Sequence, residues 1–228
     1  MAKIRKFVSL VGVVFASTVI HIEAQAQNPS NYYIEDPRTF YAGVIAGANF
    51  SQVDGDSYAG YHKVGFNAGG IVYTHLAPNL AVSLEILFSQ KGARGHRTQE
   101  SGAQTFINAY RINLNYAEIP IQINYFDKRR SHFGGGFSYS QLINANEVLE
   151  TNPPQQPGNT GYVDLEKYPF KKSDLNFVLG GSLHLWKGLF VQGRFQYSLL
   201  SIRKHTPPGY SRAEQYNNLW AVRFMYLF

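Results

Sequence analysis

The last eleven residues of the chain alternate strictly between two kinds of side chain. Every second residue is apolar or aromatic, which gives one face made of Trp220, Val222, Phe224, Tyr226 and Phe228. The other face carries Arg223 in its middle. A period of two is typical of a β-strand. Such a strand needs an apolar medium on one face, a partner for a guanidinium on the other and a neighbour at each edge, and a closed β-barrel in a membrane provides all three.

Seven further segments are interpreted as strands of the same kind, so the sequence predicts eight strands. They are Thr39–Gln52, Lys63–Thr74, Leu80–Lys91, Arg111–Phe126, His132–Glu147, Asp174–Leu185, Leu189–Ile202 and Asn218–Phe228. Their lengths of 11 to 16 residues equal or exceed the roughly 9–11 residues that a tilted strand needs to cross a bilayer.

The connections between these strands alternate long and short. In order they contain 10, 5, 19, 5, 26, 3 and 15 residues. In an antiparallel meander every second connection lies on the same side, and outer-membrane barrels combine short periplasmic turns with long extracellular loops. Residues 39–228 are therefore predicted to form an eight-stranded antiparallel up-and-down transmembrane β-barrel of the bacterial outer membrane, with both ends on the short-turn side.

The composition agrees with a barrel and excludes several other classes. Aromatic residues make up 15% of the chain and charged residues 16%, yet the mean hydropathy is only −0.24. The absence of cysteine excludes disulfides and a lipid anchor on a cysteine. The net charge of +6 comes from scattered residues, so we expect no nucleic acid partner; outer-membrane lipid and lipopolysaccharide are the expected partners.

The N-terminus has the pattern of a secretory signal peptide. Three basic residues precede an apolar run from Phe7 to Ile20, and a small-x-small site, Ala24-Gln25-Ala26, follows. We predict a signal peptide over residues 1–26 and a short periplasmic segment over residues 27–38. The alternative, a membrane anchor helix, is disfavoured because the apolar run is shorter than the about 20 residues that such a helix needs.

The strands also predict which charges face inward. Glu85, Glu118, Arg194 and Arg223 lie on the polar faces of their strands, and Lys91 shares the face of Glu85. A charge facing lipid in the middle of the bilayer costs about 2–4 kcal/mol. We therefore predict a lumenal charge network in which Glu85 and Glu118 meet Arg194 and Arg223, since buried charges must be paired.

Three segments resemble a known family. The stretches 46–52 (AGANFSQ), 84–92 (LEILFSQKG) and 114–120 (LNYAEIP) are similar to motifs of the PorT-type outer-membrane β-barrels of Gram-negative Bacteroidota. The resemblance implies an eight-stranded outer-membrane barrel. Its founding member is linked to protein secretion across the outer membrane by the type IX route. The family supplies no catalytic residues to carry over.

Few residues suggest catalysis or metal binding. Ser182 and His184 are two positions apart on one inward face, so a nucleophile–base pair is conceivable, but no orienting acid is visible. His96 and His205 are predicted to be loop histidines. Asp54 and Asp56 match only part of a calcium-binding loop, and a turn is the better interpretation. We predict no cofactor, metal or catalytic site.

The sequence thus favours a non-enzymatic outer-membrane barrel that acts through its extracellular loops or as a subunit of an envelope assembly such as a secretion system. Three alternatives stay open. They are a membrane-embedded hydrolase or acyltransferase acting on lipid or peptide, a narrow pore, and a soluble lipocalin-like carrier with the two faces inverted.

Overall fold

The computed structural model describes residues 40–58, 60–95, 99–101, 105–152, 154, 162–207 and 211–228. The predicted signal peptide (1–26) and periplasmic segment (27–38) lie outside these residues, as does His96. In the described chain, no helix is long and apolar enough to cross a membrane.

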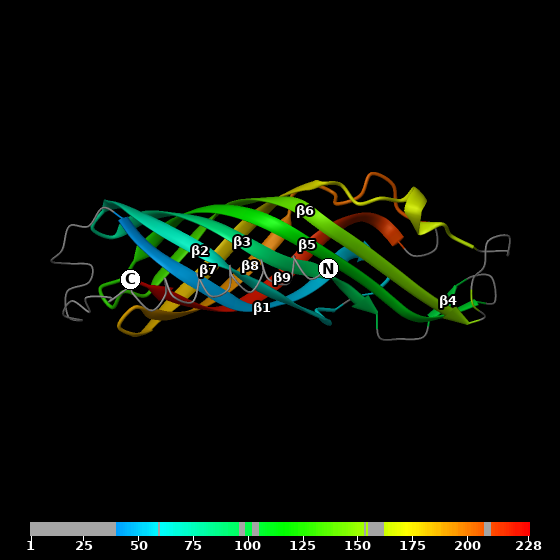
Figure 1. Ribbon diagram of the computed structural model, residues 1–228, viewed down its shortest axis with the longest axis horizontal. Coiled ribbons are helices and arrows are strands. Elements are labelled where there is room, and N and C mark those ends of the chain that lie inside the picture. Colours follow the sequence, from blue (N-terminus) through cyan, green and yellow to red (C-terminus); the bar gives the residue numbers. More distant parts are fainter. Residues whose placement is uncertain are drawn as a thin grey trace, which may run out of the picture. The chain divides into compact units, whose positions relative to one another are not determined.

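Eight antiparallel strands form a closed ring (Figure 1). The strands are β1 (Phe40–Asp56), β2 (Lys63–Ala77), β3 (Leu80–Gly95), β5 (Thr105–Phe126), β6 (His132–Asn152), β7 (Ser173–Trp186), β8 (Leu189–Ser198) and β9 (Ser211–Leu227). β1 pairs with both β2 and β9, and the β3–β5 pairing completes the circle. A short ninth strand, β4 (Gln99–Ser101), pairs only with β5, and a single 3₁₀ turn, η1 (Leu165–Lys167), follows β6. The predicted eight-stranded barrel is confirmed.

Several strands run further toward the long loops than the sequence predicted. β5 and β6 contain 22 and 21 residues, about twice the length that crosses a bilayer. β1 continues to Asp56 and β9 starts at Ser211, whereas Gln52 and Asn218 were the expected limits. The expected 10-residue loop after β1 consequently contains six residues (57–62), and the expected 15-residue loop before β9 contains 12 (199–210).

The missed strand end of β5 has a clear physical cause. From Ala117 to Tyr125 the outward side chains are apolar, and the inward ones are polar except for Pro120. From Arg111 to Tyr116 the polarity is reversed: Arg111 faces out, whereas Ile112 and Leu114 are fully buried inside. The period of two is unbroken, so the strand continues while its environment changes from lipid to water.

One strand is shorter than predicted. β8 ends at Ser198 and not at Ile202, because the chain turns inward there. The amide of Ile202 donates to the carbonyl of Gln215 (2.8 Å), and the Ile202 side chain is 1% exposed within an apolar cluster. Burial of this side chain is incompatible with continuing straight along the barrel wall.

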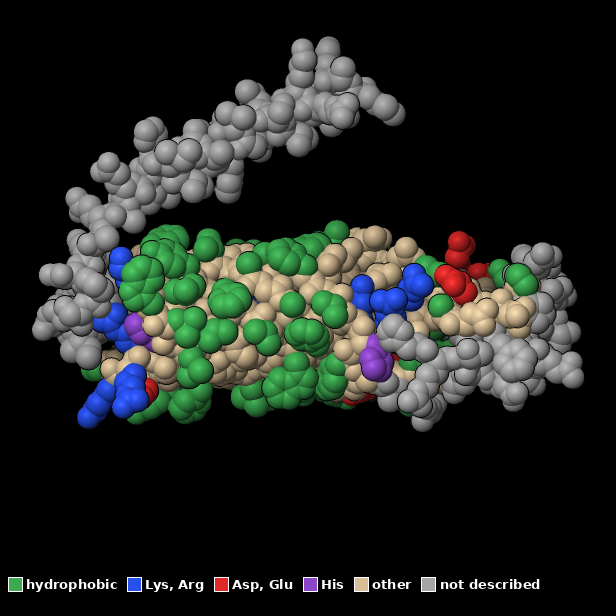
Figure 2. Space-filling view, turned by 90° about the horizontal axis from the view of Figure 1, so that it is seen from below, with side chains coloured by type: hydrophobic (Ala, Val, Ile, Leu, Met, Phe, Trp, Pro, Cys, Tyr) green, Lys and Arg blue, Asp and Glu red, His purple; other side chains and the backbone are tan. Residues whose placement is uncertain are grey.

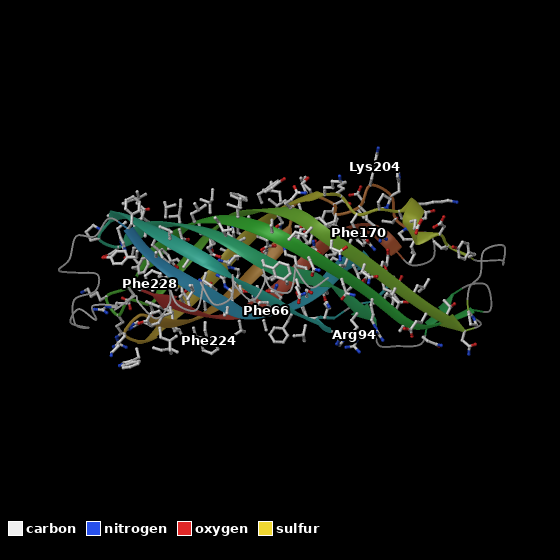
Figure 3. All side chains as sticks on the ribbon, in the orientation of Figure 1. Phe66, Arg94, Phe170, Lys204, Phe224 and Phe228 are labelled. Atoms are coloured by element: carbon white, nitrogen blue, oxygen red, sulfur yellow. The ribbon has the colours of Figure 1, made fainter. Side chains whose placement is uncertain are left out.

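The outer wall carries a broad apolar band. Ile86, Leu183 and Phe133 are 67%, 62% and 66% exposed, and Figure 2 shows such side chains over much of one face of the barrel. In Figure 3, Phe66, Phe224 and Phe228 project outward from the ribbon. Exposed apolar surface of this extent marks contact with a membrane or a partner.

A glycine makes room for one of the largest lumenal side chains. In the strand register Gly47 lies opposite Arg223 and Gly180 opposite Arg194. A Cβ atom added at Gly47 would lie 2.3 Å from the Val222 carbonyl oxygen and 2.9 Å from Cγ of Arg223. A narrow eight-stranded barrel has an interior just wide enough for side chains, so a guanidinium fits best where its neighbour has no side chain.

Candidate functional site: the ionic lumen

A carboxylate with two guanidiniums occupies the middle of the lumen. Glu85, on β3, is fully buried. Its Oε1 lies 2.5 Å from an Arg194 nitrogen, and its Oε2 lies 3.0 Å from a nitrogen of Arg223. β8 and β9 therefore supply two cations to one carboxylate that approaches from the other side of the barrel. The structure brings together three of the four residues that the sequence assigned to the charge network.

Two glutamines complete the coordination of these charges. Gln122 Nε2 donates to Glu85 Oε1 (3.0 Å), and Gln192 Oε1 accepts from Nε of Arg223 (2.9 Å). Gln192 and Arg223 are partners in the β8–β9 register. Burying an ion costs roughly several kcal/mol of hydration free energy. Only close ion pairing and additional hydrogen bonds offset this cost. Neutral amides on the neighbouring strands supply those bonds here.

The fourth predicted residue has a different partner from the one expected. Glu118 Oε1 lies 2.5 Å from Nζ of Lys91, so its ion pair is with a lysine and not with an arginine. Ser140 Oγ donates to the same carboxylate at 3.1 Å. Lys91 is fully buried and also donates to Asn176 (3.2 Å). Glu118 lines the same small cavity as Arg194 and Arg223, but its direct ion pair is with Lys91 of β3.

A third polar layer was missed by the sequence analysis. Asp174, 2% exposed, accepts hydrogen bonds from Ser198 Oγ (2.7 Å) and Asn217 Nδ2 (3.0 Å). Its alternation on β7 placed it inward, but nothing in the sequence indicated the register that joins it to β8 and β9. The cavity between the Glu118 and Arg223 groups holds about 10 Å³, room for about one water molecule.

An apolar cluster closes the lumen at the long-loop end. Val53, Tyr58, Ala93, Tyr110, Ile112, Leu114, Tyr116 and Ile202 form it. One ion pair lies beside the cluster, between Arg203 and Glu147, and the Arg203 guanidinium lies 3.8 Å from the centre of the Phe170 ring. Tyr110 donates to Glu147 (2.5 Å), and burial together with that carboxylate raises the pKa of the Tyr110 hydroxyl.

Aromatic rings close the opposite end. His132 stacks on Phe126 with ring centres 4.3 Å apart, and a 2.9 Å hydrogen bond joins its Nε2 to the hydroxyl of Tyr73. Phe190 is fully buried and lies against the same histidine. Charged layers in the middle and packed rings or aliphatic groups at both ends thus fill the lumen.

Comparison with known proteins places this geometry in a family. The model of the outer membrane protein beta-barrel domain matches residues 24–203, which includes every strand from β1 to β8. The chain belongs to this family. It is therefore an outer-membrane β-barrel protein, and its apolar band is the surface that contacts lipid. No curated protein matches the chain.

Solved outer-membrane barrels are similar over most of the chain. Ail, the attachment invasion locus protein of Yersinia pestis, is 13% identical, with 84% of this chain and 100% of that chain covered and a TM-score of 0.46. The Neisserial surface protein A is 9% identical, with coverages of 84% and 98% and a TM-score of 0.45. The family assignment rests on the match to the domain model.

The two residues considered for catalysis do not form a pair in this barrel. Ser182 accepts a hydrogen bond from Gln192 Nε2 (2.8 Å). His184 Nε2 donates to the main-chain carbonyl of Lys187 (2.6 Å). Both residues lie beside the β7–β8 turn, at the short-turn end. Each side chain has a structural partner, and the nucleophile–base hypothesis loses its geometric support.

The candidate metal ligands also have structural partners. Asp54 accepts from Asn218 Nδ2 (3.0 Å), and Asp56 accepts from the amide of Tyr58 (2.8 Å). Both aspartates belong to β1 and not to a loop, which corrects their predicted place. His205 is exposed. Across the described ranges, no group of three or more His, Cys, Asp or Glu side chains is arranged to hold a metal ion.

The central charge cluster yields a stability prediction. Glu85→Gln leaves two buried guanidiniums without a carboxylate, so we expect the folded barrel to lose about 3–5 kcal/mol. Urea unfolding in lipid vesicles, followed by tryptophan fluorescence, measures the change. Glu166→Gln is the matched control, because Glu166 is exposed in η1, and it should leave the midpoint unchanged. Equal midpoints for the two variants would contradict the assigned role of Glu85.

Proposed function

We propose that this outer-membrane barrel is non-enzymatic and acts through the surface at its long-loop end, by its loops or as a subunit of an envelope assembly. The filled lumen is the observation that carries the proposal. Glu85 and its two arginines occupy the middle, and packed side chains close both ends. Over the residues that the structure describes, an interior of this kind offers neither a substrate cavity nor a water-filled path, which leaves the outer surfaces to interact with other molecules.

The extension beyond the apolar band supports the same proposal. β5 and β6 pair from Phe126↔His132 at the short turn to Phe106↔Asn152 at the far end. Beneath the long connections, the apolar cluster around Tyr110 and Ile112 forms a small core of its own. Binding residues are often carried on loops held by a rigid scaffold, and this core holds the strand ends rigidly above the bilayer.

A conductance measurement tests the filled lumen. The purified barrel is reconstituted into planar bilayers, and we expect no stepwise current, because a closed ionic layer and two packed ends block ion passage. A porin in the same bilayers serves as the positive control, and protease protection of the reconstituted barrel verifies its insertion. Reproducible single-channel steps would establish a pore and refute this function.

We further propose that the assembly is one of protein secretion. The resemblance of segments 84–92 and 114–120 to PorT-type barrels supports this finer assignment. Both segments contribute to the lumenal charge layers through Glu85 and Glu118, so the similarity extends to residues that pack the interior. The loop-bearing end is then the surface through which the barrel contacts its secretion partners.

Site-specific cross-linking tests this proposal in living cells. A photoreactive residue at Lys204, exposed on the long-loop side (Figure 3), should give a discrete adduct with another envelope protein. The same residue at Phe133, exposed in the apolar band near the short turns, should give none. Deletion of the gene should also lower the amount of secreted protein in the medium. A Lys204 adduct together with unchanged secretion would support a role in an envelope assembly and refute the role in secretion.

A further inference from the structure

The ladder between β2 and β3 ends before the strands reach the long-loop end. Their ladder stops at Asn67↔Ser89, whereas β3 and β5 stay paired as far as Gly95↔Tyr110. Beyond that point side chains replace the ladder. Gln90 Oε1 of β3 accepts from the amide of Phe66 of β2 (3.2 Å), and Ser51 Oγ of β1 donates to the carbonyl of Gly92 of β3 (3.0 Å). A gap in the strand pairing therefore opens on this side of the barrel.

A basic cavity of about 310 Å³ lies at this gap. Its lining residues are His62, Lys63, Val64, Ala93, Arg94, Arg111 and Asn113, with no carboxylate among them. Lys63 Nζ donates to Asn113 Oδ1 (2.5 Å). Partial burial and the nearby Arg94 guanidinium lower the pKa of Lys63. The volume matches that of small-ligand pockets, roughly 300–1,000 Å³, and the charge suits an anion.

The two arginines oppose each other directly. Arg94 and Arg111 are partners in the β3–β5 register, and like charges facing each other across a pair of strands destabilise it. Within the described part of the chain, neither guanidinium forms an ion pair with a carboxylate. An anion between them would turn a repulsive arrangement into a stabilising one, and the planar guanidinium group suits phosphate oxygens particularly well.

The position of the cavity identifies the kind of anion. Val64 and Phe66, next along β2, are 61% and 50% exposed on the outer wall. Figure 2 shows basic side chains and a histidine gathered where the apolar band ends, and Figure 3 shows Phe66 and Arg94 on the same side of the barrel. An anionic lipid held here would place its acyl chains against the apolar band and its charged group at the bilayer surface.

We propose that this cavity binds a phosphate group of a phosphorylated glycolipid from the outer leaflet of the outer membrane. Arg94 and Arg111 contact the phosphate oxygens, Lys63 adds a third positive charge, and the acyl chains lie along Val64 and Phe66. This inference rests on the membrane placement of the barrel and is independent of the role proposed for the loops. Bound lipid would bridge the unpaired ends of β2 and β3.

A lipid-retention experiment tests the site. The barrel is reconstituted with diphosphorylated or fully dephosphorylated lipid A, washed in neutral detergent, and the retained lipid is counted by native mass spectrometry. We expect the wild-type protein to retain at least tenfold more of the phosphorylated form. Equal retention of the two forms would refute the proposal without any variant.

The variant arm uses Arg94→Gln with Arg111→Gln. We expect at least a tenfold loss of retained diphosphorylated lipid A, because both phosphate-contacting groups are removed. In neutral detergent without lipid, its thermal midpoint should be no lower than that of the wild type, since the like-charge pair is gone. Lys128→Gln with Arg129→Gln, the same charge change in the exposed turn at the opposite end, should retain as much lipid as the wild type.

Inorganic phosphate distinguishes a lipid site from a site for free anions. Phosphate alone should leave the thermal midpoint of the detergent-solubilised wild type unchanged, whereas diphosphorylated lipid A should raise it. A rise with phosphate equal to that with lipid A would overturn the assignment to a lipid. Normal lipid retention by the double arginine variant would overturn the assignment to this cavity.

Discussion

The ion pairs between Glu85 and two arginines constrain the arrangement of the rest of this barrel. A charge on the lipid side of a strand is costly, and eight strands enclose an interior with little room for water. Each inward charge therefore needs a partner on another strand, and Glu85 unites β3, β8 and β9. The glycine opposite Arg223 follows from this, because a side chain at Gly47 would collide with that arginine.

The reversal of polarity along the strands divides the barrel into two environments. In the apolar band, outward side chains such as Ile86 and Phe224 contact lipid, and the lumen is ionic. Toward the long loops, Ile112 and Leu114 turn an apolar surface inward and Arg111 faces out. The backbone is paired in both regions, so only the change in side-chain polarity indicates where the membrane ends. The basic cavity lies at this boundary.

The sequence was sufficient to predict the ring, the inward charges and the short-turn side, because each depends on a period of two and on loop length. It was insufficient where strand register decides. Glu118 pairs with Lys91 because of the stagger between β3 and β5, and no local pattern contains that stagger. The ends of β5 and β6 were missed because the apolar and polar faces exchange sides there, so the sequence no longer shows the pattern of a membrane-spanning strand. The inward turn at Ile202 depends on a cluster formed by distant strands.

The central claim is that the apolar wall faces lipid while the charges are sealed inside. The chain has no cysteine, so a single cysteine at Ile86, carrying a fluorophore, reports on one point of the wall in lipid vesicles. We predict strong quenching by a nitroxide on the lipid chains and no quenching by iodide, whereas a label at Lys204 should show the reverse. Iodide quenching of the Ile86 label equal to that at Lys204 would contradict the account.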